Sequence, residues 1–97
     1  MKYYNKGIAA HLEAILKLLD DDHFIYENIQ GVGPIDIITV NKETGEVTFY
    51  DAKSDRTSRH KKRPQSTIQK KLGVKNIYVN LHKRTWRLEG KVGKLQD

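Results

Sequence analysis

The chain of 97 residues contains no cysteine, only two prolines and no long apolar run. Without cysteine, a disulfide framework and thiolate metal sites are excluded. No stretch approaches the roughly 20 apolar residues of a membrane-spanning helix, and the opening residues lack the apolar centre of a signal peptide. We therefore expect a cytoplasmic protein with no membrane partner. The length suits one domain over residues 1–97, and because so small a domain is only modestly stable alone, we expect a homodimer.

Acidic residues are the minority, since 12 Asp and Glu stand against 18 Lys and Arg, for a formal charge of +6. The excess is uneven, because seven basic residues fall within sixteen positions of the second half. These residues are Arg56, Arg59, Lys61, Lys62, Arg63, Lys70 and Lys71. Such a cluster is typical of a surface that binds a polyanion, most often a phosphate backbone, and equally typical of a solvated loop and helix face.

Hydrophobic periodicity predicts a short α/β order of elements. Apolar residues recur at helical spacing between residues 6 and 19, which predicts an amphipathic helix. Strands are predicted over 23–30, 35–40 and 47–54, a second helix over 64–72, a strand over 74–81, a hairpin partner over 85–90, a mobile basic loop over 55–63 and a frayed tail over 91–97. The predicted fold is a mixed sheet of about four or five strands flanked by two helices, in the order α-β-β-β-α-β-β.

Two neighbouring apolar strands each carry an aspartate. A four-residue hairpin loop over 42–45 would set Val40 opposite Val47, and therefore Asp36 opposite Asp51. Like charges that face each other across a strand pair are destabilising, so two carboxylates in this register call for a cation between them. Lys53 follows Asp51 by two residues and shares its face of the strand. A slip of one residue would send one aspartate to the other face.

The order of elements and these residues resemble the core of the PD-(D/E)xK nuclease superfamily. Its two half-motifs correspond here to Pro34, Ile35 and Asp36, and to Asp51, Ala52 and Lys53. Two departures from the written motif exist: Ile35 separates the proline from the first acid, and the second acid is Asp rather than the commoner Glu. Neither departure removes a carboxylate.

The resemblance implies a metal-dependent endodeoxyribonuclease that hydrolyses phosphodiester bonds in DNA. Asp36, Asp51 and the backbone carbonyl of Ala52 would hold Mg²⁺ or Mn²⁺, which prefer oxygen ligands. Lys53 would orient or help to deprotonate the attacking water, or neutralise the phosphate. The number of metal ions, one or two, is left open.

The first predicted helix contains a segment, KGIAAHLEAILKLL, that resembles the opening of archaeal Holliday junction resolvases. In this match their catalytic glutamate falls on His11, and Glu13 matches a second glutamate. We expect Glu13 to be the helix-borne catalytic residue and metal ligand. His11 is left open between a phosphate contact and a structural or solvated histidine. The resemblance implies a structure-specific enzyme, similar to Holliday junction resolvases and compatible with a phage origin.

The segment RPQSTIQKKLGVKNIYVNL also resembles these enzymes, in which a helix with a glutamine follows the strand of the catalytic lysine. We expect Gln69 to hold the nucleophilic water or the backbone. Gln65 is a candidate DNA contact, with an exposed helix glutamine as the alternative. Lys70, Lys71 and the basic residues of the 55–63 loop would bind phosphates, which gives affinity without sequence choice.

Two other functions remain open from the sequence. A sequence-specific endonuclease of homing or restriction type would share the fold, but a chain of this size has little room for a separate reading domain. A non-catalytic nucleic-acid-binding module would use only the basic surface, and Asp36 and Asp51 would then be strand-end acids paired with neighbouring basic residues.

Overall fold

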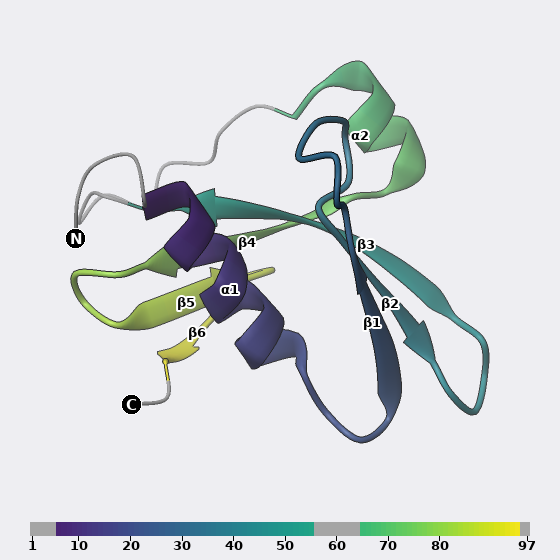
Figure 1. The fold of residues 1–97 in the computed structure, drawn as a ribbon, viewed down its shortest axis with the longest axis horizontal. Coiled ribbons are helices and arrows are strands. Elements are labelled where there is room, and N and C mark those ends of the chain that lie inside the picture. The colour runs from purple at the N-terminus through teal and green to yellow at the C-terminus, as the bar shows by residue number, and fades with distance from the viewer. Residues whose placement is uncertain (1–5, 56–64, 96–97) are drawn as a thin grey trace.

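A computed structural model describes residues 6–55 and 65–95. The elements are α1 (Lys6–Leu18), β1 (His23–Glu27), β2 (Ile37–Asn41), β3 (Val47–Ser54), α2 (Thr67–Leu72), β4 (Lys75–Asn80), β5 (Thr85–Leu88) and β6 (Lys91–Lys94). The strands form one sheet in chain order, in which only β3 and β4 are parallel neighbours (Figure 1). The α/β class with a mixed sheet is therefore confirmed. The predicted count of four or five strands is wrong, because the described residues form six.

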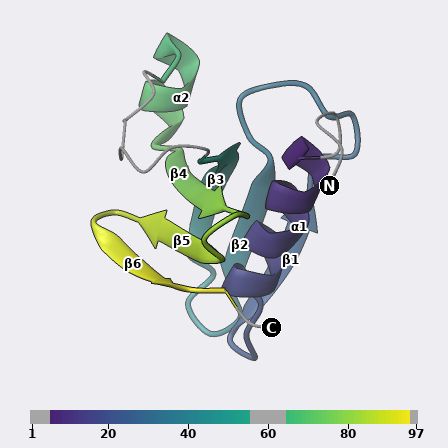
Figure 2. The ribbon, with the colours of Figure 1, turned by 90° about the vertical axis from the view of Figure 1, so that its left-hand side faces the viewer.

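Helix α1 covers one face of the sheet, across β3 and β4. Its alanines, Ala10 and Ala14, are almost completely buried and let the helix approach the sheet closely. They pack in one cluster with Ile37, Ile77 and Val79, which are fully buried on the facing strands. Burial of each such aliphatic side chain contributes about 1.5–3 kcal/mol. Figure 2 shows α1 at the right, running alongside the sheet, and β5 and β6 extending to the left of the view.

Helix α2 is a short, well-capped connection between the parallel strands β3 and β4. Ser66 accepts a hydrogen bond from the backbone of Gln69, whose side chain in turn accepts one from the backbone of Ser66. Gly73 ends the helix in the left-handed conformation, with φ of 68°, as the sequence predicts. The predicted start at Pro64 lies outside the described residues, and the helix begins at Thr67.

The prediction that both helices flank the sheet is wrong for α2. None of its six residues is buried, and it lies beyond the end of the sheet rather than against a face (Figure 1). A parallel strand pair needs a crossover connection, and α2 serves that purpose without adding to the core. Neither of the two helices in the described ranges is long and apolar enough to cross a membrane.

The C-terminal segment is ordered where the sequence predicts a frayed tail over 91–97. Residues 91–94 pair with β5, and Leu95 is 8% exposed within the core; residues 96–97 lie outside the described residues. Pairing is possible because Gly93 stands opposite Trp86 and leaves room for the indole ring.

Of the predicted basic loop over 55–63, the structure describes only Asp55, which binds Nε of Arg87 at 2.9 Å.

Substitution of Gly93 by Ala should destabilise the protein. A Cβ atom there would lie 2.7 Å from three atoms of the Trp86 ring, so the ring or the strand would have to move. We expect a loss of about 1–3 kcal/mol in the free energy of unfolding, measured by urea denaturation. Gly7→Ala is the matched control, because a Cβ at Gly7 meets nothing within 4 Å. Equal stabilities for the two variants would contradict the packing described for β6.

Candidate active site

The β2–β3 hairpin sets the register that the sequence predicts. Val40 pairs with Val47 and Ile37 with Tyr50, so the next residues outward are Asp36 and Asp51. Strand β3 has eight residues and β2 has five, which means that β3 continues past the end of β2 at this point. The two aspartates therefore meet where one strand ends and its neighbour goes on.

Asp36 and Asp51 form a coupled carboxylate pair. The backbone amide of Ala52 donates a hydrogen bond of 2.9 Å to Oδ2 of Asp36. Burial, reinforced by the hydrogen bond with Asp51, raises the pKa of Asp36 to about 6. Burial alone would raise the pKa of Asp51 too, but hydrogen bonds to Asp36, Lys53 and Gln69 hold it below its usual value. Between the lowered pKa of Asp51 and about pH 6, the pair therefore holds one proton, which resides on Asp36, and the charge is on Asp51.

Lys53 and Gln69 both bind the same oxygen of Asp51. Nζ of Lys53 and Nε2 of Gln69 each lie 2.9 Å from Oδ2 of Asp51, which is itself only 7% exposed. Nε2 of Gln69 also donates to the carbonyl of Pro34 at 3.1 Å. One glutamine thus ties α2 to β3 and to the segment that leads into β2. The structure brings together four of the residues singled out from the sequence.

The donor set fits a divalent cation bound by two carboxylates. Within residues 6–55 and 65–95, no group of three or more His, Asp or Glu could hold a metal ion. Mg²⁺ is commonly held by one or two carboxylates, with waters and substrate phosphates completing its shell. Burial and the hydrogen bond with Asp51 raise the pKa of Asp36 to about 6, and a cation bound between the two carboxylates would displace that proton. That the backbone carbonyl of Ala52 also binds the metal ion stays a prediction.

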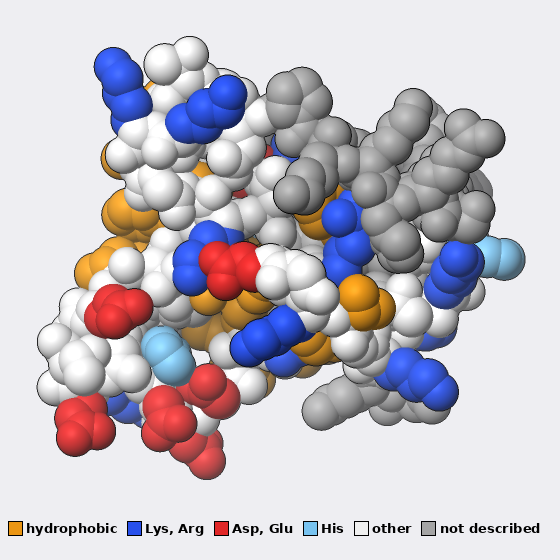
Figure 3. Space-filling model, turned by 180° about the vertical axis from the view of Figure 1, so that it is seen from behind, with side chains coloured by type: hydrophobic (Ala, Val, Ile, Leu, Met, Phe, Trp, Pro, Cys, Tyr) orange, Lys and Arg blue, Asp and Glu red, His pale blue; other side chains and the backbone are white. Residues whose placement is uncertain are grey.

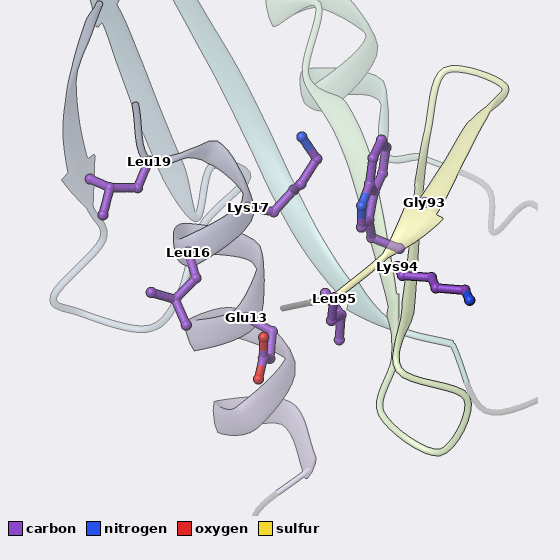
Figure 4. A pocket seen from close by; sticks show the side chains of 8 residues that line it. Glu13, Leu16, Lys17, Leu19, Gly93, Lys94 and Leu95 are labelled. Carbon is purple, nitrogen blue, oxygen red and sulfur yellow. The ribbon is translucent and has the colours of Figure 1, made fainter. Parts of the chain in front are cut away.

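The structure does not bring Glu13 to the carboxylate pair. Its carboxylate binds Nη2 of Arg84 at 3.1 Å and lines a cavity of about 330 Å³ between α1 and β6 (Figure 4). The reason is the alternation of β3, in which Tyr50 and Ala52 pack toward α1 while Asp51, between them, faces the other way. A helical wheel shows which side of a helix meets a sheet, but not which face of the sheet carries the site.

His11 and Gln65 are engaged within the chain. Nε2 of His11 lies 3.0 Å from Oε2 of Glu27. The effect of His11 on Asp36 is to lower its pKa, but burial and the hydrogen bond with Asp51 outweigh it. Nε2 of Gln65 donates to the Val74 carbonyl at 2.6 Å, which anchors the start of α2 to β4. The contact of His11 supports its structural alternative. Gln65 is not an exposed helix glutamine, because it precedes α2 and is partly buried.

The predicted phosphate contacts are only partly described. Lys70 and Lys71 are exposed in the last turn of α2, the helix that carries Gln69. The five basic residues of the predicted loop lie outside the described residues; they are Arg56, Arg59, Lys61, Lys62 and Arg63.

One feature of the site was not singled out from the sequence. A cavity of about 410 Å³ adjoins Asp36, and its lining includes Tyr26 and Ile38, which pair across β1 and β2. Because side chains two residues apart share a strand face, the β1–β2 register would have placed Tyr26 near the aspartates. The segment between β1 and β2 is longer than a hairpin turn, so the sequence does not predict which residues of these two strands pair.

Comparison with known proteins assigns no family, since no family model, curated protein or solved structure matches the chain. A function for this protein therefore has to be inferred from the carboxylate pair and its surroundings.

Asp36→Asn should stabilise the protein at neutral pH. A carboxyl group whose pKa is raised from 3.8 to about 6 stabilises the fold while protonated, and this contribution is lost as the pH rises through that window. Asparagine has no proton to lose and therefore gains no charge as the pH rises. Its side-chain oxygen can still accept the hydrogen bond from the Ala52 amide. Allowing for partial exposure, we expect the variant to be more stable by about 1 kcal/mol at pH 7 and nearly equal to wild type at pH 4.

Chemical denaturation across this pH range measures the effect, with Glu43→Gln as control. Glu43 lies exposed in the loop between β2 and β3, at the other end of β2 from Asp36. A stability difference for Asp36→Asn that does not grow between pH 4 and pH 7 would contradict the coupled pair.

Proposed function

We propose that the protein is an Mg²⁺- or Mn²⁺-dependent DNA endonuclease with Asp36, Asp51 and Lys53 at its active site. The observation that carries the proposal is the pair of facing carboxylates on adjacent strands, with a lysine bound to the second. Structural ion pairs are common, but two acids held together so that the pKa of one is raised are costly to a fold at neutral pH, and such pairs cluster at functional sites.

Asp36 and Asp51 would hold the divalent cation. When bound, this ion would lower the pKa of a water molecule and stabilise the charge that develops on the scissile phosphate. In the reaction, the oxygen of water bonds to phosphorus while one P–O ester bond breaks. The products are a phosphate monoester and a hydroxyl group.

Lys53 supplies a fixed positive charge beside the carboxylates. Its ammonium group binds Oδ2 of Asp51 at 2.9 Å and is partly exposed, with 28% of its side chain accessible. A cation in this position can attract the phosphate and orient the attacking water. Gln69 is a positioning residue, because it binds Oδ2 of Asp51, and its other contacts are to the Pro34 carbonyl and within the cap of α2.

Basic residues next to the site suit a DNA backbone. Figure 3 shows Lys side chains at the upper left, where α2 lies when the molecule is seen from behind. Lys70 and Lys71 provide this charge at the end of α2. The basic residues between 56 and 63 lie outside the described residues, and we propose them as further phosphate contacts on the grounds of their charge. Contacts of this type give affinity that depends on salt but not on sequence.

The proposed substrate is DNA of a particular shape, such as a branched junction or flap. This part rests on the resemblance of the first helix and of the Gln69 segment to Holliday junction resolvases. We also propose that the enzyme acts as a homodimer. Ile8, Leu12 and Leu16 on α1, with Leu19 directly after the helix, are each more than half exposed and form an apolar stripe that a second copy could cover.

Cleavage assays test the catalytic proposal. Four-way junction, flap and linear duplex DNA are incubated with the protein in Mg²⁺, Mn²⁺ or EDTA. We expect metal-dependent cleavage of a branched substrate that falls about 100-fold or more in Asp36→Ala, Asp51→Ala and Lys53→Ala, because each change removes a ligand or the adjacent cation. Glu13→Ala should retain cleavage, since Glu13 lies on the α1 side of the sheet with Arg84.

Two outcomes would favour the other functions. Binding of all three DNAs without cleavage in either metal supports a non-catalytic binding module. Cleavage of linear duplex at one sequence supports an enzyme of restriction or homing type.

The phosphate contacts of α2 should appear in the salt dependence of binding. Replacing Lys70 and Lys71 together by Ala should reduce the slope of log K against log salt by between about 1 and 2, since each phosphate contact contributes about 0.9. Lys42→Ala is the control, because Lys42 stacks on Phe24 at the other end of β2, with Nζ 5.1 Å from the ring centroid. Equal slopes for wild type and the α2 variant would place the DNA path elsewhere.

A further inference from the structure

The cavity of about 410 Å³ beside Asp36 opens on the face of the sheet that α1 leaves uncovered. Its floor is formed by Tyr26 and Ile38, which pair across β1 and β2, and Pro34 lies in its wall. Asp36 belongs both to this lining and to the carboxylate pair. The cavity and the proposed active site are therefore continuous.

The wall of the cavity is preformed by Asn28. Its Nδ2 donates to the carbonyls of Val32 and Ile35, at 2.6 and 3.0 Å, and its Oδ1 accepts from the amide of Gln30 at 2.9 Å. These bonds fix the loop between β1 and β2. Because they engage the Asn28 amide within the loop, the floor offered to a ligand is an aromatic and aliphatic surface.

Tyr26 presents an aromatic ring to solvent within this cavity, with 55% of the residue exposed. Val32, on the same loop wall, is 71% exposed. An exposed aromatic ring beside apolar groups is a stacking platform for nucleobases, and stacking of one base is worth about 1–3 kcal/mol. An apolar loop residue next to it can hold such a base away from its neighbours.

We propose that this cavity binds one unpaired nucleobase, which stacks on Tyr26 next to the scissile phosphate. The proposal rests on the nuclease function above, since a nucleotide whose phosphate lies at Asp36 and Asp51 carries its base within reach of the adjoining cavity. A base inside a duplex is covered on both faces by its neighbours, so only an unpaired base can offer a face to Tyr26. The site would thereby select DNA with single-stranded nucleotides at a branch.

DNA binding without cleavage tests the proposal. A flap DNA and a fully paired duplex are titrated in EDTA, with 2-aminopurine at the unpaired nucleotide next to the duplex. Tyr26→Ala should weaken binding of the flap about tenfold or more and leave the duplex within twofold. Tyr26→Leu, which keeps apolar volume without a ring, should lose as much, and Tyr26→Phe should bind within twofold of wild type. Quenching of 2-aminopurine should occur with wild type and disappear in Tyr26→Ala.

Phe24→Ala is the matched control. Phe24 lies on the same strand and face as Tyr26 and is similarly exposed, at 52%, but it is not part of the cavity. Unchanged flap binding by Tyr26→Ala, or an equal loss in Phe24→Ala, would overturn the proposal. So would a wild-type dimer in sedimentation that Tyr26→Ala dissociates, because a second copy would then occupy the cavity.

The same experiment separates this inference from the nuclease proposal. If wild type cleaves no DNA with Mg²⁺ or Mn²⁺ but the Tyr26 variants lose flap binding, base stacking stands and catalysis fails. If wild type cleaves a flap while Tyr26→Ala binds it normally, only the cavity assignment fails.

Discussion

The structure depends on the register of the β2–β3 hairpin. Asn41 fixes it, because its Oδ1 accepts hydrogen bonds from the amides of Glu43 and Thr44, both at 2.9 Å, and its own amide donates to the Glu46 carbonyl. A slip of one residue would turn the buried side chain of Ile37 to the uncovered face and separate the two aspartates. The same few hydrogen bonds at the loop therefore secure the core at one end of β2 and the carboxylate pair at the other.

Bringing two carboxylates together works against stability, and the surrounding contacts limit the cost. Asp36 is bound by the Ala52 amide, and Asp51 by Lys53 and Gln69. Below about pH 6 the proton on Asp36 removes one negative charge, whereas at neutral pH both acids are charged and depend on these contacts. None of these contacts is needed to close the core, which lies on the opposite face beneath α1. A pair that weakens the fold yet is supported by three separate contacts is best explained by a ligand that it serves.

The sequence alone predicted the parts of the site that depend on strand alternation and hairpin length, which is why Asp36, Asp51 and Lys53 were located correctly relative to one another. Gln69 was found from the helix that follows β3. Glu13 was misplaced because helical periodicity does not reveal which face of the sheet a helix covers. The strand Lys91–Lys94 has no alternating apolar pattern, and it forms because Gly93 accommodates the ring of Trp86, a contact between segments that no local signal announces.

The uncovered face of the sheet follows from the same arrangement. A domain of this size gains stability by covering both faces of its sheet, yet Phe24, Tyr26 and Val47 remain about half exposed on the face of the aspartates. A second helix laid across that face would bury these side chains, but it would also close the approach to Asp36 and Asp51. The fold instead keeps α2 short and beyond the sheet, where Gln69 reaches Asp51 from the side. Leaving this face open gives up apolar burial and keeps the approach to Asp36 uncovered, as the proposed nuclease function requires.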